Sequence, residues 1–323
     1  MDPLIQNFPT VPRGTQYRCG LCGGGGGERC GRKCADLLEQ RILNAGPENV
    51  AAFIVEPIGG GQDPGAHPHP GYFERAKEVC EKHDILFIAD EILTGLGRTG
   101  TSFAMDRFDV TPDVILAGKG LTAGYAPAGA VLPHERVVDP FRDRAAGFGH
   151  GHTNTFHPTT AAIGAAVLEY TERRNLIENA ANVGEHLGAH LQRLTDFDVV
   201  GDVRGAGMLH GVEFVADRAT KAPLENGSKL REAIYTKGLE NGLLLATGGG
   251  HLEGTSGDFL VVAPPLTTSR SEIETIVDRL YDTVGAAIER PTWRPTAPTD
   301  SHPLWTFSRH RHHGVRPRSG SRT

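Results

Sequence analysis

Two apolar segments that each end in an ionisable residue constrain the fold more than any other feature. Residues 85–89 (Ile-Leu-Phe-Ile-Ala) read as a buried strand that runs directly into Asp90 and Glu91. Residues 114–117 (Val-Ile-Leu-Ala) read as a second strand, and Lys119 follows it between two glycines. In an open α/β sheet, ligands bind at the carboxyl ends of the strands. The pattern therefore predicts that an acid and an amine face one ligand.

Other apolar segments extend this pattern along the chain. Residues 51–55 and 129–132 read as strands, and residues 71–83 carry apolar side chains at helical spacing. Near-continuous apolar strands that alternate with helices are typical of a mainly parallel sheet covered by helices on both faces. The first half of the chain is therefore predicted to be an α/β domain.

The second half alternates longer helices with short strands, which predicts a smaller α+β domain packed on the sheet. Helices are expected at 158–173, 176–194, 229–241 and 271–288, and strands near 199–200, 208–215, 243–246 and 259–262. The expected division is a Cys/Gly-rich N-terminal segment of the large domain (1–50), the rest of that domain (51–170), the small domain (171–290) and a disordered basic tail (291–323).

Composition narrows the possible partners and the compartment. A formal charge of −6 over 323 residues gives no general attraction to nucleic acid or to anionic membranes. No apolar run approaches the ~20 residues needed to cross a bilayer, and the first residues lack the features of a signal peptide. We therefore expect a cytoplasmic protein without nucleic-acid or membrane partners.

The acid and amine suit one cofactor in particular, pyridoxal 5′-phosphate (PLP). A lysine amine can form a Schiff base with the PLP aldehyde, and a carboxylate can keep the pyridine nitrogen protonated. Asp90 alone would be read as a strand-end residue that caps a turn, and Lys119 alone as a surface lysine. The segment after the lysine (121–125, Leu-Thr-Ala-Gly-Tyr) looks buried, which favours the cofactor interpretation.

Three motifs in this order resemble class III aminotransferases, which are PLP enzymes of the aspartate aminotransferase fold (fold type I). They are Asp-Glu-Ile-Leu-Thr-Gly-Leu-Gly-Arg-Thr-Gly at 90–100, Gly-Lys-Gly at 118–120 and Ala-Pro-Pro-Leu at 263–266. The resemblance extends from about residue 51 to about residue 290. It implies an α/β large domain with a mainly parallel sheet, a smaller C-terminal domain and a homodimer with shared active sites.

The resemblance also assigns roles by position. Asp90 would bind the pyridinium nitrogen, and Lys119 would be the Schiff-base lysine that also moves the proton. Ile92 would pack on the ring. Glu56 would lie near Asp90 and act through it rather than touch the cofactor directly. Thr153 would hold the cofactor phosphate of the neighbouring subunit. Arg204 matches a family position that looks structural.

Some family features are not matched. The family carries a Gly-Ser-Glu-Ala phosphate loop and a ring-stacking aromatic residue well upstream of the lysine, and nothing before Ala51 resembles either. The chain thus looks like an N-terminally truncated member. Val261 and Val262 stand where members that bind an amino acid carboxylate often have arginine, and Gly61 stands where some carry glutamate. The substrate therefore stays open.

The predicted function is transfer of an amino group from an amine or amino acid to a keto acid or aldehyde. An aminomutase or a decarboxylase of the same family is the alternative, because the motifs do not separate these reactions. A catalytically inactive truncated member is the second alternative.

Four cysteines give a separate pattern, C-x2-C-x7-C-x3-C, at Cys19, Cys22, Cys30 and Cys34. Four thiolates can hold a tetrahedral zinc, but the middle gap is shorter than the roughly 15–20 residues of zinc ribbons. The spacing favours structural or free thiols, so no metal is predicted and zinc is the alternative. His67, His69 and the tail histidines (His310, His312, His313) are expected in solvated segments.

Overall fold

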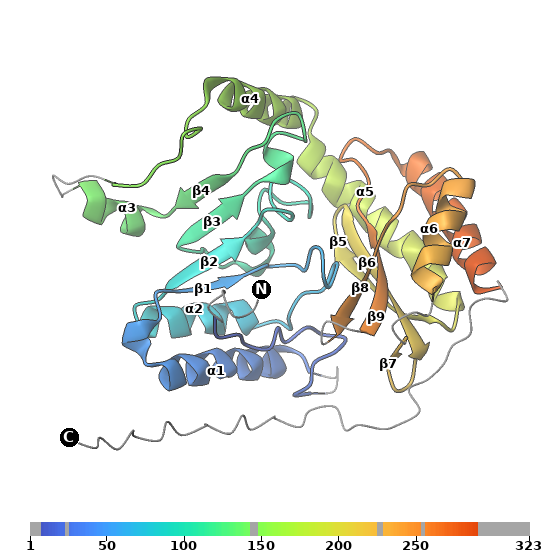
Figure 1. The fold of residues 1–323 in the computed structure, drawn as a ribbon, viewed down its shortest axis with the longest axis horizontal. Coiled ribbons are helices and arrows are strands. Elements are labelled where there is room, and N and C mark those ends of the chain that lie inside the picture. The colour runs from blue at the N-terminus through green and yellow to red at the C-terminus, as the bar shows by residue number, and fades with distance from the viewer. Residues whose placement is uncertain (1–7, 23–25, 143–147, 225–228, 253–255, 290–323) are drawn as a thin grey trace, which may run out of the picture.

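The computed structural model describes residues 8–22, 26–142, 148–224, 229–252 and 256–289, which form two lobes (Figure 1). The basic tail (291–323) and the tail histidines lie outside the described residues. No helix in these ranges is long and apolar enough to span a membrane.

The first lobe contains a four-stranded sheet of order β1-β2-β3-β4. The first three strands are parallel, with Val55 opposite Ala89 and Asp90 opposite Leu116, and the last strand is antiparallel. The mainly parallel sheet is thus confirmed. The strands are β1 (Ala52–Val55), β2 (Leu86–Asp90), β3 (Val114–Ala117) and β4 (Ala130–Pro133).

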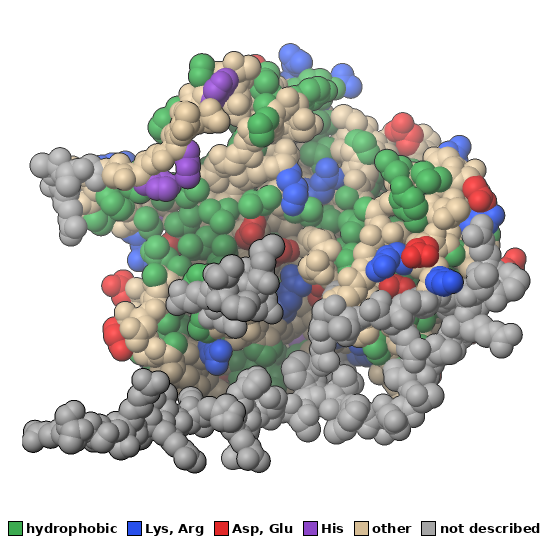
Figure 2. All heavy atoms as spheres, in the orientation of Figure 1, with side chains coloured by type: hydrophobic (Ala, Val, Ile, Leu, Met, Phe, Trp, Pro, Cys, Tyr) green, Lys and Arg blue, Asp and Glu red, His purple; other side chains and the backbone are tan. Residues whose placement is uncertain are grey.

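Helices cover one face of this sheet rather than two. Phe87 and Ala89 of β2 are fully buried against two helices, α1 (Glu28–Ala45) and α2 (Tyr72–Lys82). On the opposite face, Ile54 and Val131 are exposed, and Figure 2 shows hydrophobic side chains open to view over the sheet. The prediction of two covered faces is wrong for the described residues. An apolar strand pattern predicts that both faces are covered, but it does not say whether elements of the same chain cover them.

Helix α1 lies within the segment that the sequence marked only as Cys/Gly-rich. Its buried face consists of small and apolar side chains at helical spacing, and two of the cysteines belong to it. The buried residues are Cys30, Gly31, Cys34, Ala35, Leu38 and Ile42.

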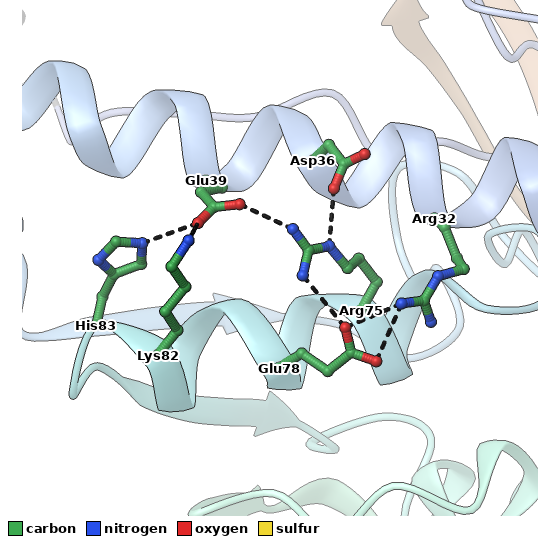
Figure 3. Close-up of polar contacts among 7 residues, drawn as sticks. All are labelled: Arg32, Asp36, Glu39, Arg75, Glu78, Lys82 and His83. Atoms are coloured by element: carbon green, nitrogen blue, oxygen red, sulfur yellow. Dashed lines mark hydrogen bonds and ion pairs between the residues drawn. The ribbon is translucent and has the colours of Figure 1, made fainter.

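A network of ion pairs joins α1 to α2 (Figure 3). Arg75 of α2 donates to Asp36 at 2.7 Å and to Glu39 at 2.8 Å, and Glu39 also accepts from Lys82 at 2.6 Å. The hydrogen bonds from Lys82 and His83 lower the pKa of Glu39 to about 2. Isolated surface pairs contribute little, but a connected network fixes the register of two helices.

His69 corrects the expectation of a solvated histidine loop. Its side chain is buried, and its Nε2 lies 3.5 Å from Cys22 Sγ. His67 is partly buried, where its Nδ1 contacts Gln16 Nε2 at 3.2 Å. Residues 67–69 are covered because the N-terminal segment forms a β-bridge from Thr15 to Pro68.

The second lobe is an antiparallel sheet of order β5-β6-β9-β8, with β7 paired to β6. Helices α5, α6 and α7 cover it and share one apolar core with it (Figure 1). The predicted small α+β lobe is present. Its elements are α5 (Leu176–Leu191), β5 (Val200–Ala206), β6 (Leu209–Asp217), β7 (Ala222–Pro223), α6 (Leu230–Glu240), β8 (Ala246–Leu252), β9 (Ser256–Val262) and α7 (Arg270–Ile288).

Between the lobes, α4 (Pro158–Arg173) follows the short helix α3 (Glu135–Arg142) and leads into α5 (Figure 1). Although α4 is rich in alanine and also carries Ile163, Val167 and Leu168, only Gly164 on it is buried. The short 3₁₀ helices are η2 (Pro47–Asn49), η3 (Ala104–Phe108), η4 (Lys119–Leu121) and η5 (Gln192–Asp196).

A buried carboxylate, Asp113, fixes the start of β3. It accepts hydrogen bonds from Lys77 Nζ at 2.7 Å, from Arg136 Nε at 2.5 Å and from the Phe87 amide at 2.7 Å. Burial alone would raise the pKa of Asp113, but the hydrogen bonds from Arg136 and Lys77 outweigh it and lower the pKa to about 2. Asp113 thus joins β2, β3, α2 and α3.

We expect Asp113→Asn to lower the free energy of unfolding by about 3 kcal/mol, because Lys77 and Arg136 lose their buried counter-charge. Urea unfolding at neutral pH measures this loss. The matched control is Asp139→Asn, since Asp139 is an exposed carboxylate that pairs with Arg142 at 3.0 Å.

The loss should depend on pH with a defined sign. Because the folded pKa lies below the unfolded value of roughly 3.9, the contribution of Asp113 is full above about pH 5 and falls as pH drops toward 2. The difference between the wild-type protein and Asp113→Asn should therefore shrink over that range. A difference that stayed constant down to pH 2 would contradict this assignment.

Candidate active site at the ends of β1, β2 and β3

The carboxyl ends of the three parallel strands meet at one cavity. Glu56 follows β1, Asp90 ends β2, and Lys119 lies two residues beyond β3. All three line a cavity of about 170 Å³ together with Ile92. The remaining lining residues are Gly60, Gly61, Leu93 and Thr94. Four of the five predicted cofactor residues thus share one cavity, and Thr153 is not among its lining residues.

Asp90 is half-buried, and its Oδ1 accepts a hydrogen bond from the Ile92 amide at 3.1 Å. This bond fixes the Asp90 carboxylate at the cavity. It also turns the backbone after β2, so that Ile92 lines the same cavity. Ile92 keeps 36% of its surface exposed, and a Cβ on Gly118 would lie 3.3 Å from its Cγ2. A carboxylate and an apolar side chain therefore lie side by side, which suits a ring that carries one polar nitrogen.

Lys119 has a backbone φ of 37°, in the left-handed region that non-glycine residues rarely adopt. The residue opens η4, where the Leu121 amide donates to Gly118 O at 2.9 Å. Lys119 is exposed, and Tyr125 is 80% exposed. The expectation that this segment is buried is therefore wrong for most of it, because it lies at the open edge of the sheet. Thr122 is its buried member.

Glu56 supports the loop that closes one side of the cavity. Its Oε2 accepts from the Gly60 amide at 2.7 Å and lies 3.7 Å from Arg13 Nη2. Its position in the lining places it in the same cavity as Asp90, as the resemblance implied.

Glu91 has a structural role that the sequence did not reveal. It is 1% exposed, and its two carboxylate oxygens accept from the Ala104 amide at 3.0 Å and the Met105 amide at 2.8 Å. Burial raises the pKa of Glu91 despite these bonds and the hydrogen bond from Thr94. Asp90 thus lines the cavity while Glu91 binds backbone amides on the other side, because adjacent side chains of an extended chain point to opposite faces. This alternation could have predicted from the sequence that Asp90 and Glu91 have different surroundings.

Arg98 joins the two lobes. Its Nη1 donates to Pro264 O at 2.6 Å and to Met208 O at 3.2 Å, and its own carbonyl accepts from the Met208 amide at 2.9 Å. The glycines around Arg98 allow this approach. A Cβ on Gly100 would lie 2.8 Å from Ala181 of α5, and one on Gly207 would lie 2.4 Å from Thr99. The 97–100 string is therefore a joint between the lobes rather than a ligand contact.

Arg204 is also structural, in line with the sequence expectation. It forms ion pairs with Asp63, with Asp202 at 2.7 Å and with Glu213 at 2.8 Å. Burial opposes its charge, but the carboxylates of Asp63, Glu213 and Asp202 raise its pKa. The residue lines a larger cavity of about 330 Å³ between the lobes, in which Arg18 pairs with Glu213 and Lys221 Nζ donates to Tyr17 O at 2.6 Å.

Thr153 lies in the turn before α4 and is exposed. The nearby Thr155 hydroxyl accepts from the His152 amide at 2.8 Å. The structure of one chain thus leaves Thr153 open to solvent.

Comparison with known proteins adds independent findings. The family described as Aminotransferase class-III matches residues 3–284. An uncharacterized aminotransferase of Bacillus subtilis is 37% identical over 257 residues, which cover 79% of this chain and 58% of that protein. An adenosylmethionine-8-amino-7-oxononanoate aminotransferase of Geobacter sulfurreducens is 35% identical over 288 residues, 87% of this chain and 61% of that protein.

Solved structures agree with the sequence relatives. The omega transaminase of Pseudomonas jessenii in complex with PMP superimposes with a TM-score of 0.76 at 33% identity. The match covers 86% of this chain and 60% of that one, so the chain spans about three fifths of the length of these relatives. The fold is that of the fold-type-I transaminases. The chain belongs to the class III aminotransferase family.

Proposed function

We propose that this protein is a PLP-dependent aminotransferase. The observation that carries the proposal is that Asp90 and Lys119, from adjacent parallel strands, line one cavity. An acid and an amine at neighbouring strand ends are the two groups that a pyridine aldehyde requires from a protein.

The residues present fit the cofactor. Once bound, PLP would supply an electron sink for the bond that breaks at the substrate carbon. Asp90 would accept a hydrogen bond from the protonated pyridine nitrogen, and Ile92 would pack on the ring. Lys119 Nζ would be the covalent attachment point and would hold and move the proton at the substrate carbon. Glu56 holds the loop at residue 60 against the cavity.

The substrates we propose are a small amine or amino acid donor and a keto acid or aldehyde acceptor. An aminomutase or a decarboxylase stays the first alternative, because the motifs do not separate these reactions. An inactive member is the second, because the chain spans about three fifths of its relatives' length. The aminotransferase is favoured because the relatives named above carry that name.

We also propose a homodimer in which Thr153 serves the cavity of the partner subunit. The support is the exposure of Thr153, together with the apolar surface of α4, on which Leu168 and Tyr170 are both more than a third exposed. An apolar helix that contacts little of its own chain is a suitable dimer surface.

We place the protein in the cytoplasm, without nucleic-acid or membrane partners. The net charge of −6 supports this placement, as do five free cysteines among the described residues. Thiols stay reduced in the cytosol.

The first prediction is a visible absorbance band when PLP is added, and its loss in Lys119→Ala. Transamination should fall by at least about 10²-fold in the variant, because the lysine carries the proton. Lys237→Ala is the matched control, since Lys237 lies in the second lobe and pairs with Glu240. A folded wild-type protein that binds PLP without a Lys119-dependent band would refute the site and favour the inactive alternative.

The second prediction concerns sharing of the site. Lys119→Ala and Thr153→Ala should each be inactive alone, and a mixture that is unfolded and refolded together should regain activity. In a mixed dimer, one cavity has its own Lys119 and the partner's Thr153 intact. No recovery, with mixed dimers shown by mass spectrometry, would mean that Thr153 does not act across the interface.

The third prediction separates the reactions. Conversion of an amine donor should require a keto acid or aldehyde acceptor and should consume it one for one. Turnover without any acceptor, with release of carbon dioxide or with an isomeric amine as product, would favour the decarboxylase or the aminomutase. The measurement is product analysis by mass spectrometry with and without acceptor.

A further inference from the structure

A cluster of sulfur and nitrogen donors lies in the first lobe, outside the cavity described above. Cys19 and Cys22 come from the N-terminal segment, Cys30 from the first turn of α1, and His69 from the loop before α2. One donor atom from each of the four lies within 4.8 Å of all the others. The sequence alone could not reveal this set, because His69 is far from the cysteines along the chain.

Two of the six separations between the donor atoms are close to the edges of a zinc tetrahedron. Cys19 Sγ lies 3.5 Å from Cys30 Sγ, and Cys22 Sγ lies 3.5 Å from His69 Nε2. With Zn–S and Zn–N bonds of about 2.3 and 2.0 Å, a tetrahedral ion places two sulfurs roughly 3.8 Å apart and a sulfur and a nitrogen roughly 3.5 Å apart. The other pairs of donor atoms lie within 4.8 Å of one another, so they would approach by roughly 1 Å at most to reach these edges.

The cluster is enclosed by protein. Cys19, Cys30 and His69 are buried, and Cys22 is partly buried. The backbone at Gly26 passes over two of the sulfurs, where a Cβ would lie 2.7 Å from Cys30 Sγ and 2.9 Å from Cys22 Sγ. Four protein donors without an open position are typical of structural zinc rather than catalytic zinc.

Backbone contacts outside the cluster hold the donors in place. The Gln16 amide donates to His67 O at 3.3 Å, and Thr15 forms a β-bridge with Pro68. On the other side, α1 lies so close to the histidine loop that a Cβ on Gly31 would be 2.0 Å from Pro70 O. The two loops and α1 are therefore positioned by the fold, which lowers the cost of ordering the ligands on binding.

We propose that Cys19, Cys22, Cys30 and His69 bind one structural zinc ion. Soft thiolates select zinc over the hard divalent cations. The ion would enter with release of the protons of the three thiols, and the imidazole would bind through its neutral Nε2. It would fasten the N-terminal segment and the loop at residues 67–70 to α1. This assignment replaces the free-thiol interpretation that the sequence favoured, because the histidine completes the set.

Two other sets of donors are the competitors. Cys34, one helical turn beyond Cys30, lies 3.6 Å from Cys19 Sγ and could replace His69. In the second lobe, His186, His190 and Glu274 also lie within 4.8 Å of one another, but they are partly or fully exposed and offer no thiolate. The experiment has to distinguish both of these donor sets from the set that contains His69.

The test is the zinc content of the full chain, purified without chelator under reducing conditions, by inductively coupled plasma mass spectrometry. About one zinc per chain is expected. Cys22→Ser, Cys30→Ser and His69→Ala should each lose at least about nine tenths of it, since ligand loss weakens binding strongly. Cys34→Ser, His190→Ala and Cys80→Ser, which removes the buried cysteine of α2, should keep it.

A second measurement serves if the ligand variants fail to fold. Wild-type protein stripped of metal and loaded with cobalt(II) should show the visible bands of a tetrahedral thiolate complex, and zinc should remove them. Its melting temperature should rise when zinc is restored. Neither readout depends on PLP or on transamination, so failure here leaves the proposed function untouched.

Three results would overturn the proposal. The first is wild-type protein without stoichiometric metal and without a cobalt spectrum. The second is loss of zinc in Cys34→Ser with retention in His69→Ala, which would assign a four-cysteine site. The third is a Cys19–Cys30 disulfide found by mass spectrometry in metal-free, folded protein.

Discussion

Parallel pairing of β1, β2 and β3 is the constraint on which the candidate site depends. Because parallel strands end at the same edge, the residues that follow them are brought together without any contact between their side chains. The register places Asp90 opposite Leu116, three residues before Lys119. Asp113 anchors the start of β3 through Lys77 and Arg136, so the position of Lys119 at the other end is fixed by a buried ion-pair cluster.

Side-chain hydrogen bonds to backbone carbonyls and side-chain ion pairs, such as that of Arg204 with Asp63, tie the second lobe to the first. Arg98 donates to carbonyls at 208 and 264, and Glu91 caps η3, so the loop between β2 and η3 is fastened at both ends. Since Asp90 and Ile92 flank Glu91, the same loop that lines the cavity also joins the lobes. A substitution at Glu91 or Arg98 would therefore disturb cofactor binding and lobe packing together.

The sequence predicted the strands of the first lobe and the residues that meet at its edge, because apolar runs and strand-end polar residues are local signals. The strand expected at 243–246 is wrong, because β8 covers Ala246–Leu252 instead. Glu56, Asp90, Ile92 and Lys119 meet as expected. The sequence did not predict α1. A cysteine can be a metal ligand or a small apolar residue, and Cys30 and Cys34 belong to the apolar face of this helix. The arrival of His69 at the cysteines could not be predicted, because loop placement depends on tertiary contacts such as the bridge from Thr15 to Pro68.

Three of the nine described non-glycine residues with positive φ lie in the loop between β2 and η3 or in the segment directly after β3. Leu96, Lys119 and Ala123 all adopt positive φ, at 59°, 37° and 49°. Each costs about 1–2 kcal/mol relative to an ordinary conformation, so the fold must hold them in place. The Leu96 amide donates to Ser102 O at 2.7 Å, and the Thr122 hydroxyl donates to Ala126 O, which closes both turns. The backbone conformation of Lys119 therefore sets the direction in which its Cα–Cβ bond leaves the chain at the cavity, while the exposed side chain beyond it is free to adopt different rotamers.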